Sequence, residues 1–117
     1  RKSLDKEMAE FEKRANEKLI KELLSVVDDF ERALPEIKDK KLREGIEIIF
    51  RNFMNILEKS GLKRIEALGK KLDPYYHEAV MHGKSDKEEG TIIEELQKGY
   101  MLNSKVIRHS KVKVAKD

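Results

Sequence analysis

Histidine residues are the first place to look for chemistry in this sequence. His77 is followed directly by Glu78, as in the helical zinc motif His-Glu-X-X-His. That motif needs its second histidine four residues after the first, so that both rings face one side of a helix. Position 81 is Met81 instead, and His82 comes one residue too late. The chain also has no cysteine, which excludes thiolate ligands and disulfide bonds. We therefore expect no metal site and no cofactor.

The other residue types form no pattern that is typical of an enzyme. The six glycines are scattered singly, so the chain has no glycine-rich phosphate loop. No serine stands in the Gly-X-Ser-X-Gly pattern of a nucleophile elbow. The 23 acidic residues are numerous, but none lies among apolar neighbours, as a carboxylate prepared for proton transfer would. These observations predict a protein that binds another protein and has no catalytic residues.

The composition favours an elongated, helix-rich chain over a large globular core. Charged residues make up 42% of the 117 residues, against roughly 25% in an average globular domain, and aromatic residues only 6%. No run of about 18 apolar residues is present, and no signal-peptide pattern opens the sequence. We therefore expect a cytoplasmic protein without membrane contact. The sequence opens at Arg1 rather than at Met, which predicts a fragment of a longer protein.

The charge pattern argues against bulk binding of nucleic acid. The net charge is only +3, and the 26 basic and 23 acidic residues are well mixed. A basic β-surface can follow phosphates, but a platform for single strands needs exposed aromatic residues, and no Phe follows Phe53. A local basic bias at 105–117 is open to two interpretations, a solvated strand face or a docking patch for an acidic partner. Its charged residues are Lys105, Arg108, Lys111, Lys113, Lys116 and Asp117.

Residues 1–34 contain neither Gly nor Pro, and their apolar residues recur at steps of mostly four. This spacing predicts one long helix over 1–34, about 50 Å in length. Such a helix has no core of its own and must bury its apolar stripe against a partner helix. The stripe widens from residue 19 and consists of Leu4, Met8, Phe11, Ala15, Leu19, Leu23, Val27, Phe30 and Leu34. We expect all of these residues except Leu34 to form a dimer contact.

A second helix is predicted over about 40–60. Pro35 breaks the first helix, and Gly61 stands where a left-handed cap would end the second. Two helices per chain, doubled in a homodimer, make a four-helix bundle. The second apolar set, in which Phe50 and Phe53 are assigned to the dimer contact, consists of Leu42, Ile46, Ile49, Phe50, Phe53, Ile56 and Leu57.

After Gly61 the pattern changes to short apolar stretches separated by glycines and by Pro74. The expected strands lie at 62–68, 79–82, 91–96, 100–102, 106–107 and 112–115. Asn103-Ser104 is a candidate two-residue hairpin turn. Asp73-Pro74 opens another turn, after which Tyr75–Ala79 is expected to form one helical turn. The fold class is thus α+β, with a helical dimerisation region at 1–60 and a compact β-domain of short antiparallel strands at 61–117.

Three segments of the second half carry a resemblance to a known family. They are residues 72–80 (LDPYYHEAV), 90–100 (GTIIEELQKGY) and 102–116, which includes LN, VIR and VKVAK. Shorter matching segments lie upstream at 23–24, 27–28, 30–34 and 44–47, and Gly61 ends the second helix. Together these ordered segments resemble GrpE, the nucleotide exchange factor of DnaK-type chaperones. One departure is Ser104, which stands where the family usually has Gly in the hairpin turn.

The resemblance implies a parallel homodimer that binds the nucleotide-binding domain of one DnaK-type chaperone. It implies that a β-domain holds the nucleotide cleft open and speeds the release of ADP, while the factor itself binds no nucleotide. Gly61 would act as a cap or hinge that orients the β-domain. The partner-binding residues implied by matching positions are Leu72, Pro74, Leu96, Lys105, Arg108 and Val114 in the β-domain, with Glu47 and Arg51 on the second helix.

Alternative interpretations of these residues remain open. Leu96 and Val114 could belong to the core of the β-domain itself, in which case they would touch no partner. The whole chain could also be a dimeric coiled-coil adaptor capped by a β-domain, or a nucleic-acid-binding dimer with a basic β-surface. The three ordered segments at 72–116 favour the exchange factor over both.

Overall fold

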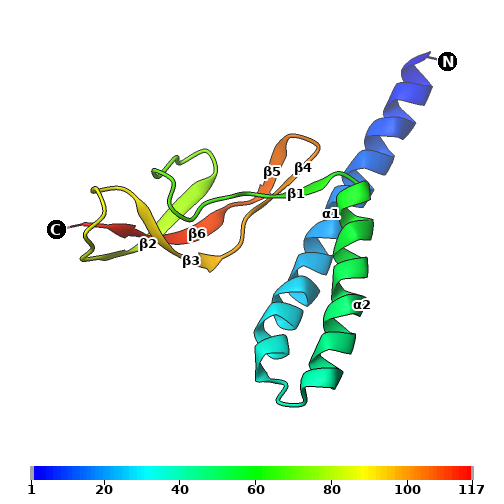
Figure 1. The fold of residues 1–117 in the computed structure, drawn as a ribbon. Coiled ribbons are helices and arrows are strands. Elements are labelled where there is room, and N and C mark those ends of the chain that lie inside the picture. The colour runs from blue at the N-terminus through cyan, green and yellow to red at the C-terminus, as the bar shows by residue number, and fades with distance from the viewer. Residues whose placement is uncertain (1, 117) are drawn as a thin grey trace. The chain divides into compact units, whose positions relative to one another are not determined.

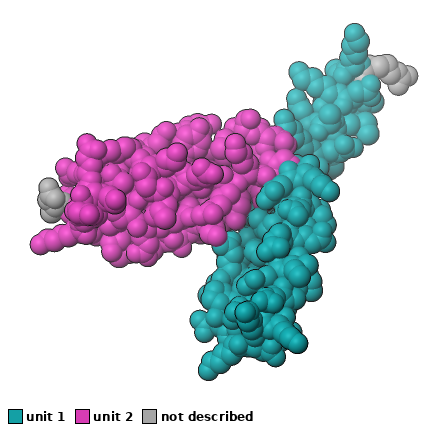
Figure 2. Space-filling model, viewed as in Figure 1, with its two compact units in different colours: residues 1–60 teal, residues 61–117 magenta. Residues whose placement is uncertain are grey.

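The computed structural model describes residues 2–116 of the chain, which divides into two compact units (Figure 2). Unit 1 comprises residues 1–60 and unit 2 comprises residues 61–117. The helices α1 and α2 belong to unit 1, and the strands β1 to β6 belong to unit 2. This succession of helices and then strands confirms the α+β class.

Unit 1 is a helical hairpin (Figure 1). Helix α1 (Lys2–Ala33) is followed by the 3₁₀ turn η1 (Leu34–Glu36) and by helix α2 (Lys40–Lys59). Pro35 lies inside η1, where its missing N–H and fixed φ end the α-helical hydrogen-bond pattern. The long helix therefore ends at Ala33, one residue before the expected position.

Both ends of α2 have capping interactions that the sequence explains. Asp39 is the N-cap, and its Oδ1 accepts a hydrogen bond from the backbone N–H of Leu42 at 3.1 Å. Ser60 is the C-cap, and Gly61 follows with a φ of 106°. This is the left-handed conformation that a residue without Cβ adopts most readily.

The two helices of unit 1 pack against each other over only part of their length. The rings of Phe30 on α1 and Phe50 on α2 stack with their centroids 5.2 Å apart. The buried side chains of the hairpin are Ile20, Leu24, Val27 and Leu57. The first turns of α1 run past the end of α2 (Figure 1), and there the apolar stripe is exposed: 51% at Leu4, 57% at Met8 and 67% at Phe11. Unit 1 thus leaves a large apolar surface without a covering in the single chain.

Unit 2 contains two three-stranded sheets, with strand orders β1-β4-β5 and β2-β6-β3 (Figure 1). Consecutive strands β5 and β6 lie in different sheets and are separated by one residue, His109. The chain therefore passes directly from one sheet into the other. The strands are β1 (Leu62–Arg64), β2 (His77–Gly83), β3 (Ile92–Gln97), β4 (Tyr100–Leu102), β5 (Lys105–Arg108) and β6 (Ser110–Ala115).

One strand pair differs from the expected antiparallel arrangement. Three pairings are antiparallel, but β2 pairs in parallel with β6. A parallel pair needs a long connection, which here is the segment 84–109 with its three intervening strands. The pattern of short apolar stretches indicates where strands lie and carries no information on their direction.

Two boundaries also differ from the prediction. Residues 77–79 begin strand β2 and do not continue a helical turn, because the turn closes at His77 and the next residues pair with β6. Strand β1 ends at Arg64 and does not reach residue 68, and the N–H of Ile65 then bonds to the carbonyl of Gly99 at 2.9 Å. In both places, pairing with distant segments overrides the local pattern.

The predicted hairpin turn between β4 and β5 is confirmed. Asn103 and Ser104 have φ values of 48° and 73°, as a two-residue type I′ turn requires. Ser104 therefore adopts a left-handed backbone conformation that glycine adopts more readily.

The core of unit 2 is a small apolar cluster between the sheet β2-β6-β3 and the segment before β2. It consists of Ala67, Ile92, Val112 and Val114, with the half-buried Leu72 packed against it. Val114 is only 4% exposed. This burial favours the alternative that the sequence left open, in which Val114 belongs to the core of the β-domain.

Candidate partner-binding surface

Leu72 and Pro74 flank the first residue of the turn that leads into β2. Leu72 is half-buried, and its backbone N–H bonds to the carbonyl of Gly90 at 2.9 Å. Pro74 is exposed, and Tyr75 beside it is 59% exposed. Leu72 therefore packs against the core, while Pro74 and Tyr75 are exposed to solvent.

Hydrogen bonds from both ends close this turn. The carbonyl of Asp73 accepts from the N–H groups of Tyr76 and His77, at 2.9 and 2.8 Å. The Oδ1 of Asp73 accepts from the N–H of Tyr75 at 3.0 Å, which is an Asx turn. In the opposite direction, the N–H of Asp73 donates to Nδ1 of His77 at 2.9 Å. Asp73 and His77 therefore hold the turn through two reciprocal contacts.

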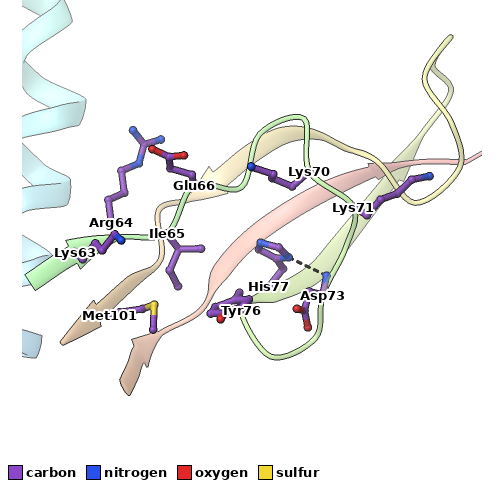
Figure 3. Close-up of a pocket in the computed structure, with 10 residues that line it drawn as sticks. All are labelled: Lys63, Arg64, Ile65, Glu66, Lys70, Lys71, Asp73, Tyr76, His77 and Met101. Carbon is purple, nitrogen blue, oxygen red and sulfur yellow. Dashed lines mark hydrogen bonds between the residues drawn. The ribbon is translucent and has the colours of Figure 1, made fainter. Parts of the chain in front are cut away.

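A pocket of about 510 Å³ opens beside this turn (Figure 3). Its size lies within the range of small-ligand sites, roughly 300–1,000 Å³. The imidazole of His77 and the ring of Tyr76 form part of its wall, and four cationic side chains surround it against two carboxylates. The lining residues are Lys63, Arg64, Ile65, Glu66, Lys70, Lys71, Asp73, Tyr76, His77 and Met101.

His77 is the titratable group in this pocket whose environment changes its proton affinity. Its side chain is buried, and this desolvation lowers its pKa below the ordinary value of 6.5. The charges of Asp73 and Glu95 act in the opposite direction, and His109 adds to the lowering. Burial outweighs the two carboxylates, so the folded chain favours the neutral imidazole.

Leu96, Lys105 and Arg108 lie on other strands of unit 2. Leu96 is 42% exposed on β3, an edge strand of its sheet, and Lys105 is exposed at the start of β5. Arg108 is half-buried: its Nε and Nη2 both donate to the carbonyl of Lys98, at 2.9 and 2.6 Å, and its guanidinium lies 5.5 Å from the ring centre of Tyr100. Arg108 therefore links the end of β5 to the connection between β3 and β4, and it also contributes positive charge.

The helical candidates belong to unit 1. Glu47 lies 3.8 Å from Arg43 in an ion pair one helical turn apart, and Arg51 is exposed one turn further on. The predicted residues thus come from α2 in unit 1 and, in unit 2, from the segment before β2 and from strands β3, β5 and β6.

Sequence reasoning singled out His77 only as a failed zinc ligand and missed its role in the turn. The signal was present, since a histidine stands four residues after the Asp of an Asp-Pro turn. The ion pair of Glu95 with Arg64, whose Oε1 and Nη2 lie 2.5 Å apart, was also missed. Arg64 on β1 and Glu95 on β3 lie 31 positions apart in the sequence and belong to different sheets.

Residues 2–116 contain neither a cluster of metal-binding side chains nor a membrane-spanning helix. No group of three or more His, Cys, Asp or Glu side chains in this part of the chain could hold a metal ion. No helix within the same residues is long and apolar enough to cross a membrane.

Comparisons with known proteins identify the family. The GrpE family model matches residues 1–116. Protein GrpE of Methanosphaera stadtmanae is 54% identical over 95% of this chain, and that of Methanothermobacter thermautotrophicus is 49% identical over 99%. Protein GrpE of Caldanaerobacter subterraneus subsp. tengcongensis is 48% identical over 99%. The chain spans 65%, 66% and 58% of these relatives' own lengths. On this evidence, the chain belongs to the GrpE family.

Proposed function

We propose that this chain acts as a nucleotide exchange factor for a DnaK-type chaperone. The observation that carries the proposal is the family match over residues 1–116, which includes both the helical hairpin and the β-strand unit. The activity comes from the resemblance of the three ordered segments to GrpE. In this role the chain is a co-chaperone without catalysis of its own, and it works in the cytoplasm beside its chaperone.

The proposed mechanism is a shift between two states of the chaperone. A factor that binds the open nucleotide cleft more tightly than the closed one raises the population of the open state. ADP then leaves faster, and no bond is made or broken. Because such coupling is reciprocal, ADP must weaken the chaperone's affinity for the exchange factor by the same ratio. The mechanism needs no nucleotide site on this chain.

The proposed active form is a homodimer joined through unit 1. The support is the uncovered apolar surface of the hairpin, since soluble monomers rarely leave large apolar patches exposed. The residues of this surface that are more than 50% exposed are Leu4, Met8, Phe11, Leu19, Leu42, Ile48, Ile49 and Ile56. Packing two hairpins together would bury this surface in a four-helix bundle.

The proposed chaperone contact is on unit 2. Pro74 and Leu96 supply exposed apolar area, and Leu72 packs against the core cluster at the base of the Pro74 turn. Lys105 and Arg108 supply positive charge for steering toward an acidic surface. Glu47 and Arg51 on α2 would make a secondary contact. Val114 is left out because it lies in the core.

Calorimetric titration of the chaperone's nucleotide-binding domain tests this proposal. The expected result is saturable binding that weakens when ADP is added, as reciprocity requires. Equal affinity with and without ADP would rule out exchange by this mechanism, and absence of binding at micromolar concentrations would rule out the partner.

A further inference from the structure

The ring of His77 is the acceptor that closes the turn at residues 73–77. A backbone N–H can only donate, so the 2.9 Å contact from the Asp73 N–H requires that Nδ1 carries no proton. The neutral ring then has its hydrogen on Nε2. A protonated ring would have hydrogens on both nitrogens and would set a donor against a donor at this distance.

This contact links the turn to the sheet. His77 begins strand β2, where it stands opposite Ser110 of β6. The N–H of Ser110 donates to the carbonyl of Tyr76 at 3.0 Å, so the residue before His77 is fixed as well. From this fixed end, the imidazole reaches back across the turn to Asp73. Pro74 lies between these two anchored points.

We propose that His77 is a positioning residue that holds the Pro74 turn in the shape the chaperone binds, and that it does so only as the neutral imidazole. The inference rests on the proposed function, because Pro74 is assigned to the contact there. It makes binding acid-sensitive: protonation of His77 opens the Asp73 contact and frees the exposed tip at Pro74 and Tyr75.

The charged groups around His77 set the conditions under which this happens. Asp73 faces it from its own turn, Glu95 from β3 and His109 from the β5–β6 connection. The pocket beside the ring also contains the side chains Lys63, Arg64, Glu66, Lys70 and Lys71. Burial dominates these effects and favours the neutral ring, so the turn is closed at neutral pH and opens in acid.

Three variants distinguish the effect of the Nδ1 acceptor of His77 from the effect of its buried ring. His77→Phe keeps a buried ring and removes the acceptor. His77→Asn keeps an uncharged acceptor, Oδ1, at a reach similar to Nδ1, and cannot titrate in this range. His82→Phe is the matched control, because it makes the same change at an exposed position of the same strand.

Two measurements on the full 117-residue chain test the proposal between pH 7.5 and 5.0. The first is hydrogen exchange of the Asp73 amide by NMR, without any partner. The second is the affinity for the nucleotide-binding domain. At neutral pH, His77→Phe should lose Asp73 protection and bind about threefold to tenfold more weakly, as expected for the loss of one part-buried hydrogen bond. His77→Asn should recover most of both, and His82→Phe should match the wild type.

The pH profile decides between a positioning role and a merely structural one. Wild type should lose Asp73 protection and affinity in acid, while His77→Asn loses less of both. Identical pH profiles would overturn the proposal, even if His77→Phe fails to fold. The proposal would also be overturned if His77→Asn bound the nucleotide-binding domain as weakly as His77→Phe does. If wild type binds no chaperone, the proposed function fails, and the amide exchange still tests the His77 contact.

Discussion

Asn103 fills the space into which a side chain on Gly61 would project. The backbone N–H of Asn103 donates to the carbonyl of Gly61 at 3.1 Å, and an added Cβ at Gly61 would overlap the Asn103 amide group. Gly61 also has a φ of 106°. The residue that begins unit 2 is thus fixed by conformation and by a neighbour from the β4–β5 turn.

Gly61→Ala should destabilise unit 2 by roughly 1–3 kcal/mol, through backbone strain and the clash with Asn103. Urea unfolding followed by circular dichroism measures this loss. Gly69→Ala is the matched control, since Gly69 has a φ of 82° but open space around it, and it should cost less. Adding Asn103→Gly to Gly61→Ala should recover part of the loss. Equal losses for Gly61→Ala and Gly69→Ala would show that the Asn103 contact has no effect.

Phe11→Asp should weaken the proposed dimer without unfolding the hairpin, because Phe11 is 67% exposed in the single chain. Sedimentation velocity over a range of concentrations checks the association, and circular dichroism at high concentration checks the helices. Lys13→Asp, on the other side of α1, serves as the control and should stay dimeric. A Phe11→Asp protein that dimerises like the wild type would exclude this stripe as the contact.

Val114→Ala should affect stability and Leu96→Ala should affect chaperone binding, because Val114 is buried and Leu96 is 42% exposed. Val114→Ala removes buried methyl groups and should cost about 1–3 kcal/mol of unfolding free energy. Leu96→Ala should change stability by less than about 0.5 kcal/mol and weaken chaperone binding. Urea unfolding and calorimetric titration of both variants provide the comparison. A stable Val114→Ala protein with lost affinity would reverse the assignment of the two residues.

The stability of the chain should depend on the protonation of His77. Because its pKa is lowered in the folded state, the unfolded chain takes up the proton first as the pH falls below about 6.5. His77 therefore contributes stability that is present above this pH, decreases below it, and levels off once the folded ring is also protonated. Urea unfolding from pH 7.5 to 5.0 should show a smaller decrease for His77→Asn than for wild type. Parallel curves for the two proteins would show that His77 has no such linkage.

Much of this fold is predictable from the sequence because its signals are local. Pro35 and the apolar steps of α1 mark the helices, and Asn103-Ser104 marks the hairpin. The parallel pairing of β2 and β6 is not local, since it joins His77 to Ser110 across the intervening strands. The burial of Val114 agrees with the alternation of Lys and Val over residues 111–114, but that alternation does not say whether the buried face meets the core or a partner.

The candidate surface was less predictable than the fold for the same reason. Pro74 and Leu96 are exposed as a contact requires, but the hydrogen bond from Asp73 to His77 depends on a ring position that only the folded turn defines. The sequence pattern identified the residues of this turn, and the folded structure identified the Asp73–His77 hydrogen bond that closes it.

Nucleotide exchange by this chain can be measured as the release of a fluorescent ADP analogue from a DnaK-type chaperone, followed by stopped flow. We expect the release rate to rise with the concentration of this chain and to reach a plateau. With Leu96→Ala, the same rise should need a higher concentration. A release rate that stays at its spontaneous value at micromolar concentrations of the folded, dimeric chain would contradict the proposed function.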